Sequence, residues 1–371
     1  MRIYNARVLI GNQFVSGGVE FDAKFRICGA CVTDGDVDAE GAYLIPGLID
    51  IHTHAAMGED VSDGKAESLP VLSRYYAKGG VTSWCPTTMT LKEPALTAAM
   101  KAIQGSERPE GGAKIAGINL EGPFLCHEKR GAQAAGNLAL PDVDMFARLN
   151  AACGGIVRLI TIAPEQPGAM EFIREVSKAC TVSLGHSMAD YDTAMAAYEA
   201  GASHTTHLFN AMRPLLHREP GIVGAACDSG ASVELICDGL HIHPSVVRIV
   251  FRLFGERTVL ISDSLRCAGM PDGEYTLSGQ TIIYRRGMAT LKGTDTLAGS
   301  GIHLLDGLRN AVSFGVPLEK AVFAASTAPA RVIGRQDSIG SVAPGLCADF
   351  LLLDESLQLR SVYIDGQRTE I

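Results

Sequence analysis

The chain has 371 residues, of which 47% are hydrophobic and 20% charged, and its 32 basic and 41 acidic side chains give a formal net charge of -9. This length suits one large globular domain or two ordinary ones, and the apolar fraction excludes wholesale disorder. The acidic balance argues against a nucleic-acid binder, whose affinity depends on clustered Lys and Arg contacts to phosphates. A small anionic substrate stays compatible, because it needs only a local positive site.

The N-terminal segment and the cysteines bear on the cellular setting. The first residues, MRIYNARVLIGNQFVSGG, lack the basic-then-apolar layout of a secretory signal and alternate like a β-strand. Ten cysteines are scattered along the chain, which is typical of reduced thiols in a cytoplasmic protein. The sequence has no apolar run near the ~20 residues that span a bilayer. We therefore expect a cytoplasmic protein with neither membrane nor nucleic-acid partners.

Eight short apolar runs that end in polar residues follow one another between residues 44 and 263. They are LIPGLIDIH, VTSWCPTT, KIAGINLE, IVRLITIAPE, CTVSLGH, ASHTTH, SVELICD and TVLISD. Segments of helical composition lie between many of them, near residues 66–78, 94–104, 170–179, 191–200 and 244–254. Strands that alternate with helices indicate a parallel sheet, and eight units predict an α/β fold, a (β/α)8 TIM-type barrel. An open doubly wound sheet is the alternative.

The two chain ends have a different pattern. Residues 1–45 and 338–371 contain short alternating segments broken by Gly and Asp, such as RIYNARVLI and LRSVYIDG. This pattern is typical of antiparallel β structure. We expect the two ends to form one small β-sandwich beside a barrel that spans residues 46–337.

Six potential metal ligands or acid/base groups end five of the eight runs. They are His52 and His54 on the first run, Glu121 on the third, His186 on the fifth, His207 on the sixth and Asp263 on the eighth. The C-terminal ends of barrel strands are where catalytic groups gather. The first two histidines are two residues apart in an extended segment, so both project from one face. Nitrogen and oxygen donors without cysteine favour zinc, iron or manganese.

The remaining histidines give weaker signals. His204 belongs to the sixth run but lies three residues before His207, so its side chain is expected on the opposite face with a structural role. His127, His217 and His303 fall in loop or helix settings. For these three histidines, two interpretations remain equally open: an exposed or locally hydrogen-bonded ring, or a ring with a function.

Several longer motifs stand in a fixed order. They are PGLIDIHTHAAMGED (46–60), NLEGPFL (119–125), SLGHS (183–187), THLFNAM (206–212), REPGIVGA (218–225), DGLHIHP (238–244), SDSLRCAGMPDG (262–273) and SIGSVAPGLCADFLLLD (338–354). This set resembles the N-acetylglucosamine-6-phosphate deacetylase family of the amidohydrolase superfamily. The resemblance implies a (β/α)8 barrel with a small β-sandwich made from both termini.

The resemblance also implies a metal centre of one or two divalent ions, zinc first, with iron or manganese as alternatives. Glu121, His186 and His207 match the principal metal ligands. The histidine pair of the first run matches a second metal position, which the aspartate of the eighth run shares. No lysine ends the fourth run, so Glu121 would have to bridge the two ions. Asp263 would act as general base and then as general acid.

Substrate contacts follow from the same resemblance. The matching positions are Ala132, Gln133, Asn210, Ala211, Arg218, His241, Leu297, Ala298 and Gly299. Arg218 corresponds to a phosphate-binding arginine of a site that can be completed across a dimer interface, which implies a homodimer. From the residues alone, Arg218 could equally be a solvated loop charge. Two departures affect specificity: RGAQ places Gln133 where the family has a histidine, and SDSLRCAG replaces the commoner TDA form.

The leading hypothesis is metal-dependent hydrolysis of N-acetylglucosamine 6-phosphate to glucosamine 6-phosphate and acetate, in amino sugar catabolism. The alternatives are deacetylation of the galactosamine epimer, or another amidohydrolase activity on a related N-acyl substrate. A non-catalytic scaffold that has lost its metal is a further alternative. Such a scaffold would have eroded ligands, and none of the six is missing here.

Overall fold

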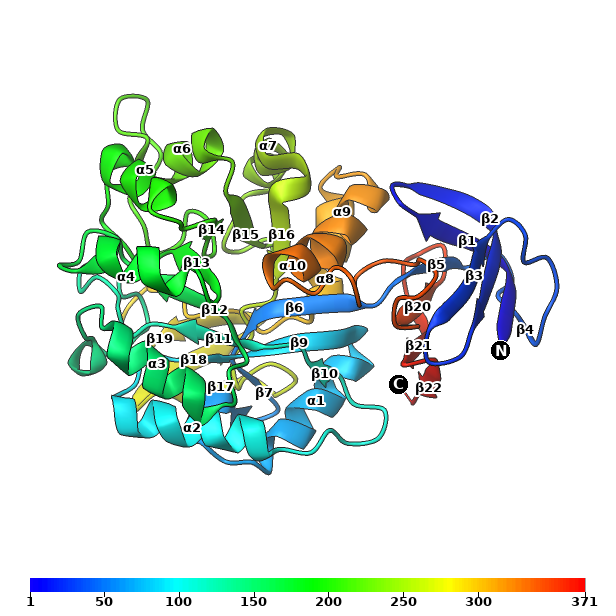
Figure 1. Cartoon of the computed structure of the whole chain (residues 1–371), viewed down its shortest axis with the longest axis horizontal. Helices are drawn as coiled ribbons and strands as arrows, with labels where there is room; N and C mark the ends of the chain where they lie inside the picture. The colour runs from blue at the N-terminus through cyan, green and yellow to red at the C-terminus, as the bar shows by residue number, and fades with distance from the viewer. Residues whose placement is uncertain (371) are drawn as a thin grey trace.

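The computed structural model describes residues 1–370 and has two parts, a helix-covered barrel and a β-sheet built from both chain ends (Figure 1). The eight predicted runs form the barrel. Its strands are β6 (Leu48–Thr53), β9 (Val81–Thr88), β11 (Ile118–Glu121), β12 (Val157–Ile162), β13 (Thr181–Leu184), β14 (His204–Thr205), β15 (Ser232–Ile236) and β16 (Thr258–Ile261). The two-residue β10 (Lys114–Ile115) is the start of the third run and pairs with β9.

The barrel strands pair in chain order and all run parallel, from β6 through β9 and β11 to β16. The last and first strands meet where the Asp263 N–H donates to the His52 carbonyl at 2.9 Å. The sheet is therefore nearly closed, which confirms the predicted barrel. The doubly wound alternative is wrong, because that sheet reverses its strand order and leaves two open edges.

Ten α-helices are present in residues 1–370, most of them around the barrel. They are α1 (Ser68–Lys78), α2 (Glu93–Gly105), α3 (Val143–Ala152), α4 (Ala169–Val176), α5 (Tyr191–Glu199), α6 (Gly221–Ser229), α7 (Pro244–Phe254), α8 (Leu304–Ser313), α9 (Leu318–Ala325) and α10 (Thr327–Val332). The five predicted helical segments correspond to α1, α2, α4, α5 and α7. Capping side chains fix where some of the helices begin: Asp142 and Asp190 accept hydrogen bonds from backbone N–H groups in the first turns of α3 and α5.

Shorter elements follow some of the barrel strands. The hairpin of β7 (Ala55–Ala56) and β8 (Glu59–Asp60) follows β6, and a three-stranded sheet follows β16. The strands of that sheet are β17 (Gly273–Leu277), β18 (Gln280–Arg285) and β19 (Met288–Leu291). Short 3-10 turns occupy η1 (Val61–Asp63), η2 (Ala135–Asn137) and η3 (Gly255–Arg257).

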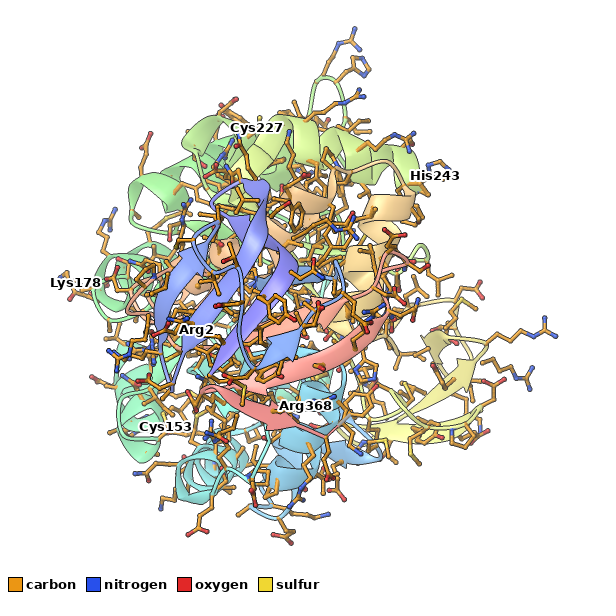
Figure 2. All side chains as sticks on the ribbon, turned by 90° about the vertical axis from the view of Figure 1, so that its right-hand side faces the viewer. Arg2, Cys153, Lys178, Cys227, His243 and Arg368 are labelled. Atoms are coloured by element: carbon orange, nitrogen blue, oxygen red, sulfur yellow. The ribbon has the colours of Figure 1, made fainter. Side chains whose placement is uncertain are left out.

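Both chain ends contribute to one eight-stranded sheet, seen face-on with blue and red strands side by side in Figure 2. Its strands are β1 (Arg2–Ile10), β2 (Gln13–Phe21), β3 (Phe25–Gly29), β4 (Val37–Asp38), β5 (Tyr43–Pro46), β20 (Phe350–Leu353), β21 (Leu359–Ile364) and β22 (Gln367–Thr369). Strand β20 pairs antiparallel with β5, which joins the two ends as expected. The predicted boundaries of 1–45, 46–337 and 338–371 stay a prediction, and Ile371 lies outside the described residues.

The terminal sheet curls over a small core of its own. The ring of Phe21 on β2 lies 5.1 Å from Phe350 on β20 and 5.8 Å from Tyr363 on β21, although these strands are far apart in the sheet order. Contacts between distant strands require the sheet to fold back on itself, which gives the two layers of the expected sandwich.

No helix in residues 1–370 is long and apolar enough to cross a bilayer. All ten cysteines are free thiols. Cys28 on β3 and Cys31 in the turn after it form one Cys-x-x-Cys pair, so the ten cysteines are not all isolated from one another in sequence. Burial raises the pKa of the Cys28 thiol to about 11, so at neutral pH it is protonated and weakly nucleophilic.

His303 has a structural place at the start of α8. Its ring stacks on Tyr75 with centroids 4.2 Å apart, and its buried Nδ1 has no hydrogen-bond partner within residues 1–370. Burial lowers the pKa of His303 below its ordinary 6.5. The unfolded chain therefore binds this proton more readily than the folded chain, so folding stability falls as pH drops below the ordinary value.

We expect His303→Phe to reduce the loss of stability between about pH 7.5 and about pH 5.5, because Phe keeps a ring against Tyr75 and does not titrate. The measurement is the free energy of unfolding of the metal-free protein at each pH. The exposed His243, changed to Phe, serves as the control. An unchanged pH dependence in His303→Phe would show that His303 titrates alike in the folded and unfolded chains.

Candidate metal centre and active site

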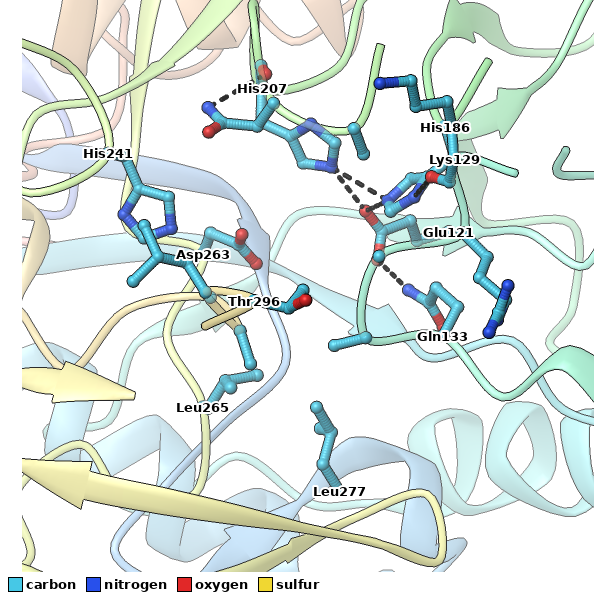
Figure 3. Close-up of a pocket in the computed structure, with 18 of the residues that line it drawn as sticks. Glu121, Lys129, Gln133, His186, His207, His241, Asp263, Leu265, Leu277 and Thr296 are labelled. Atoms are coloured by element: carbon cyan, nitrogen blue, oxygen red, sulfur yellow. Dashed lines mark hydrogen bonds and ion pairs between the residues drawn. The ribbon is translucent and has the colours of Figure 1, made fainter. Parts of the chain in front are cut away.

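A cavity of about 560 Å³ opens at the C-terminal ends of the barrel strands. It contains almost every site residue predicted from the sequence, as the close-up in Figure 3 shows for several of them. Those lining it are His54, Glu121, Ala132, Gln133, His186, His207, Asn210, Ala211, His241, Asp263, Leu297, Ala298 and Gly299. His52 lies just beneath this lining, and its Nε2 is 3.3 Å from Glu121 Oε1.

The backbone turns sharply at three of these residues. His186, His207 and Asp263 lie two residues beyond the ends of β13, β14 and β16, and their φ angles are 48°, 26° and 48°. Non-glycine residues seldom adopt this left-handed region, and such strain gathers at functional sites. The surrounding barrel holds each of these turns and aims the three side chains into the cavity.

The carboxylate of Glu121 lies at the centre of the cluster. Its Oε1 is 3.0 Å from the Nε2 of both His186 and His207 and 3.3 Å from His52 Nε2. Its Oε2 is 3.3 Å from His54 Nε2, which is also 3.3 Å from Asp263 Oδ1. Two triads of potential metal ligands therefore share Glu121, one with His52 and His54 and the other with His186 and His207.

The hydrogen bonds behind the histidines test whether this cluster fits a cation. The Nδ1 atoms of His52, His54 and His186 face Glu234 Oε2 at 2.9 Å, the Thr87 carbonyl at 3.1 Å and the Lys129 carbonyl at 2.9 Å. Each acceptor requires a proton on Nδ1. In the neutral rings the Nε2 lone pairs then point at carboxylate oxygens, which repel them unless a proton or a metal ion lies between. The donor set therefore fits a divalent metal.

The charges of the cluster shift its pKa values strongly. Burial opposes ionisation of Glu121, but His52 and His186 outweigh it and hold the pKa of Glu121 well below its usual range. Burial also opposes the charged form of His54, yet its hydrogen bonds to Asp263 and Glu121 raise its pKa to about 9. Protons and metal ions compete for the same atoms, so metal binding here must release protons.

Asp263 keeps its charge despite burial. Burial favours the protonated acid, but the hydrogen bond with His54 and the charge of His52 lower the pKa of Asp263 below its ordinary value. Asp263 lies in the cavity wall and is 8% exposed, so a solute in the cavity can reach it. An ionised and accessible carboxylate beside a cation site can accept a proton.

Sequence reasoning missed Glu234, a fully buried carboxylate on β15. Its Oε2 accepts hydrogen bonds from His52 Nδ1 and the His207 backbone N–H, and its Oε1 is 3.2 Å from His204 Nε2. Burial opposes its charge, but His52 and His204 hold the pKa of Glu234 well below its usual range. The sequence signal that could have revealed Glu234 is the presence of one charged residue inside the apolar run SVELIC.

His204 has the structural role that was expected. Its side chain contacts Ser232 and Glu234 and none of the residues that line the cavity. His127 and His217 are exposed and also lie outside the lining. The prediction that His204 stands apart from the ligands therefore agrees with its contacts.

Gln133 lines the cavity, but its amide is engaged by protein. Its Oε1 accepts the Thr90 N–H at 2.8 Å, which fixes the amide orientation, and its Nε2 donates to Glu121 Oε2. One further N–H of this amide lies 3.9 Å from the Met89 sulfur, so it has no strong partner. Gln133 therefore holds the central carboxylate through hydrogen bonds within the protein.

Arg218 does not join the other predicted residues. Its side chain is exposed, contacts His217, and borders a separate hollow with Asp190 and Asp228. The positive side chains that do line the main cavity are Lys129 and Arg130, which sequence reasoning did not single out. Arg218 is therefore absent from the lining of the main cavity of its own chain.

His241 is held in the cavity wall by its own loop. Its Nδ1 donates to Asp238 Oδ2 at 2.7 Å, and this contact, against the effect of burial, raises the pKa of His241. The imidazole is oriented by this pair and its other nitrogen is available to a ligand.

The apolar wall of the cavity combines the sheet of β17 to β19 with residues from loops next to it. Met89, Leu265, Leu277 and Ala298 belong to one hydrophobic cluster and all line the cavity. The unusual SDSLRCAG segment has a local explanation, because its Arg266 forms ion pairs with Asp60 and Asp63 and so ties the last barrel loop to the first.

Comparison with known proteins identifies the class. The amidohydrolase family model matches residues 43–369, so the chain belongs to the amidohydrolase family. This finding confirms the resemblance drawn from the motifs and makes the protein a hydrolase. Amidohydrolases use a divalent metal, and either triad around Glu121 could hold one.

Individual relatives have more specific names than the family model. The chain is 38% identical over 334 residues to N-acetylgalactosamine-6-phosphate deacetylase of Escherichia coli O157:H7, covering 89% of this chain and 88% of the relative. It is 36% identical over 374 residues to N-acetylglucosamine-6-phosphate deacetylase of Vibrio furnissii, with 97% and 93% covered. A mutant N-acetyl-D-glucosamine-6-phosphate deacetylase from Mycobacterium smegmatis, solved with N-acetyl-D-glucosamine-6-phosphate, superposes with a TM-score of 0.94 at 32% identity, covering 99% and 98%.

Proposed function

We propose that the protein hydrolyses the acetamide of N-acetylglucosamine 6-phosphate, giving glucosamine 6-phosphate and acetate in amino sugar catabolism. The observation that carries the proposal is the convergence of four histidines on Glu121 beside an ionised Asp263, in a cavity that opens to solvent. The similarity to deacetylases of amino sugar phosphates supports the substrate class. The proposed setting is the cytoplasm, which suits ten free thiols.

The proposed cofactor is zinc, with iron or manganese as alternatives, at two positions that share Glu121. His186 and His207 would hold one ion, and His52 and His54 the other, with Asp263 beside it. A divalent metal bound there would polarise the amide carbonyl and lower the pKa of water toward about 7. The protein supplies the alignment, because three of the rings are fixed from behind through Nδ1.

Asp263 carries the proton through the reaction. Its carboxylate accepts a proton from the water whose oxygen adds to the acetyl carbon. The carbon–nitrogen bond then breaks, and Asp263 delivers the same proton to the departing sugar amine. The acetic acid first formed gives up its proton to solvent or to the amine, so the products are acetate and the amino sugar phosphate. The Asp263 carboxylate is ionised again after each turnover.

Substrate recognition is assigned to the cavity wall. Gln133 and His241 each offer a hydrogen-bonding group to the sugar or its acetyl carbonyl. The loop of Leu297, Ala298 and Gly299 would pack on the sugar. The backbone of Asn210 and Ala211 would meet the phosphate, with positive charge supplied by Lys129 and Arg130 nearby.

The test is a panel of N-acetyl sugars, with and without the 6-phosphate, given to protein loaded with zinc, iron or manganese. Acetate release from N-acetylglucosamine 6-phosphate, with strong dependence on the phosphate and on metal, is the expected result. Turnover of unphosphorylated N-acyl compounds alone would replace the proposal with another amidohydrolase activity. If metal-free protein stays inactive after it is loaded with metal, the result would favour the non-catalytic scaffold instead.

Two observations favour a second candidate substrate, N-acetylgalactosamine 6-phosphate. One relative at 38% identity is a deacetylase of that epimer, and Gln133 stands where the resemblance expected a histidine. Both epimers belong in the panel, and the larger kcat/KM assigns the substrate. A higher value for the galactosamine epimer would make it the substrate and leave the mechanism unchanged.

We also propose a homodimer in which Arg218 reaches the phosphate in the partner's cavity, because Arg218 borders a separate hollow and does not line the cavity of its own chain. Loss of a charged hydrogen bond costs about 1.5–3 kcal/mol, so Arg218→Ala is expected to raise KM about 10–100-fold for phosphorylated substrate only. The exposed Arg252, changed to Ala, is the matched control.

Mixed subunits separate a contact within one chain from a contact across an interface. Asp263→Asn and Arg218→Ala chains are unfolded and refolded together. If Arg218 acts across the interface, each heterodimer has one intact site, and the random mixture should recover about a quarter of wild-type activity at low substrate. If Arg218 acts on its own cavity, mixing recovers nothing and the proposed arrangement is wrong.

A further inference from the structure

Glu234 is a buried charge in the middle of an apolar barrel strand. It lies on β15, is 0% exposed, and sits between Val233 and Leu235. A carboxylate buried this deeply is costly unless hydrogen bonds satisfy its oxygens. Three donors do so here, and two of them belong to residues of the metal triads.

The first contact fixes the tautomer of His52. Glu234 Oε2 lies 2.9 Å from His52 Nδ1 and can only accept, so the proton of the neutral ring must sit on Nδ1. His52 Nε2 is then free of hydrogen and faces Glu121 Oε1 at 3.3 Å and Asp263 Oδ1 at 3.6 Å. Without Glu234, the ring could place its proton on Nε2 and lose its ability to bind metal.

The second contact reaches the other triad. The same Oε2 atom accepts the backbone N–H of His207 at 3.0 Å, at the residue whose φ is 26°. This hydrogen bond helps to hold a strained turn, and His207 Nε2 then meets Glu121 Oε1 at 3.0 Å. One oxygen therefore aligns one ligand of each proposed ion.

The third contact keeps the carboxylate itself in place. Glu234 Oε1 accepts from His204 Nε2 at 3.2 Å, and His204 Nδ1 is 2.6 Å from the Ser232 hydroxyl. His204 is fully buried and contacts neither Glu121 nor the cavity. The chain from Ser232 through His204 to Glu234 is thus a built support that extends away from the site.

We propose that Glu234 is a positioning residue that selects the metal-binding tautomer of His52 and orients His207, and so sets the affinity of both metal positions. The inference rests on the proposed metal centre. Outer-shell partners of this kind typically change metal affinity by about 10–100-fold when removed.

The experiment measures zinc binding by competition with a chelator, in wild-type protein and in Glu234→Gln and Glu234→Ala. Gln can still accept the hydrogen bonds from His52 and His207 through its carbonyl oxygen, whereas Ala leaves these two donors and His204 without their partner. We expect affinity to fall about 10-fold in Glu234→Gln and about 100-fold in Glu234→Ala, most strongly for the ion held by His52.

Asp349→Asn is the matched control, because Asp349 is also a buried carboxylate, 4% exposed, and belongs to neither triad around Glu121. With Cys347 and Asp365 it forms a separate group of potential ligands, but Lys114 Nζ lies 2.6 Å from Asp349 and 2.7 Å from Asp365 and already pairs with both carboxylates. Asp349→Asn is expected to lower the melting temperature without changing zinc affinity. A purely structural role for Glu234 predicts the same pattern for its variants, with weaker folding and unchanged affinity in the folded fraction. That result would overturn the proposal.

A second measurement uses wild-type protein, so it tests the role of Glu234 even if the Glu234 variants fail to fold. Nitrogen NMR of histidine-labelled, zinc-loaded wild-type protein is expected to show His52 with a proton on Nδ1. A proton on Nε2 would overturn the role of Glu234 and leave the deacetylase proposal standing. Wild-type protein that binds no zinc would instead overturn the metal centre itself.

Discussion

Asp263→Asn is expected to lower kcat by about 10²–10⁴-fold, the range usual for loss of a general acid–base group. Asn has the same size and keeps an oxygen for the contact with His54 Nε2, now 3.3 Å away, but it cannot take up a proton. The expected signature is a fall in kcat with KM and metal content almost unchanged. Steady-state kinetics together with metal analysis of the same samples measures it.

Asp60→Asn provides the comparison for Asp263, since Asp60 on β8 is also a buried carboxylate but pairs with Arg266 and does not line the cavity. It should retain most of kcat. If Asp263→Asn kept wild-type kcat with full metal occupancy, another group would have to move the proton. If the Asp263→Asn protein lost its metal, the main role of Asp263 would be that of a metal ligand.

Glu121→Gln is expected to abolish binding at both metal positions and, with it, all measurable turnover. Glu121 is the one residue common to the two triads, and its negative charge faces four histidine nitrogens within 3.3 Å. The loss in affinity should exceed the about 10–100-fold effect of an outer-shell change. Equilibrium dialysis followed by metal analysis gives the number of ions per chain.

His54→Gln is the informative partner of this variant, because His54 belongs to one triad only. We expect it to lose one ion and keep the one held by His186 and His207. A Glu121→Gln chain that still bound two ions would show that the histidines hold the metals without a shared carboxylate. Equal losses in the two variants would show that the positions are not independent.

Much of the fold could be predicted because it depends on local pattern. Eight apolar runs with polar ends are visible along the chain, and helices that start with a capping Asp, such as α5, are visible too. The predicted strands and five helices follow from such short-range signals. Helix α6 was missed since GIVGAACDS consists mostly of small and apolar residues with a buried glycine start and has no clear polar face. The three-stranded sheet of β17 to β19 was missed because its segments are short and interrupted by turns.

The ligand set could be predicted for a related reason. In a parallel barrel all strands end at one rim, so a residue that ends a strand is brought near the others whatever the details of packing. His52, Glu121, His186, His207 and Asp263 illustrate this rule. Their sequence positions alone placed them at the rim, and the resemblance then supplied their proposed roles.

Tertiary structure alone decided the contacts that support and complete the site. Glu234 meets His52 across 182 positions of the chain, and Gln133 meets Glu121 because Thr90 turns its amide. Arg218 lies outside the cavity despite its place among the motifs. The physical reason is the sequence distance over which each feature is determined. Strand ends are set by the local hydrophobic pattern. The hydrogen-bond partner of a side chain depends on strand register, barrel closure and the path of the loops, which no local pattern encodes.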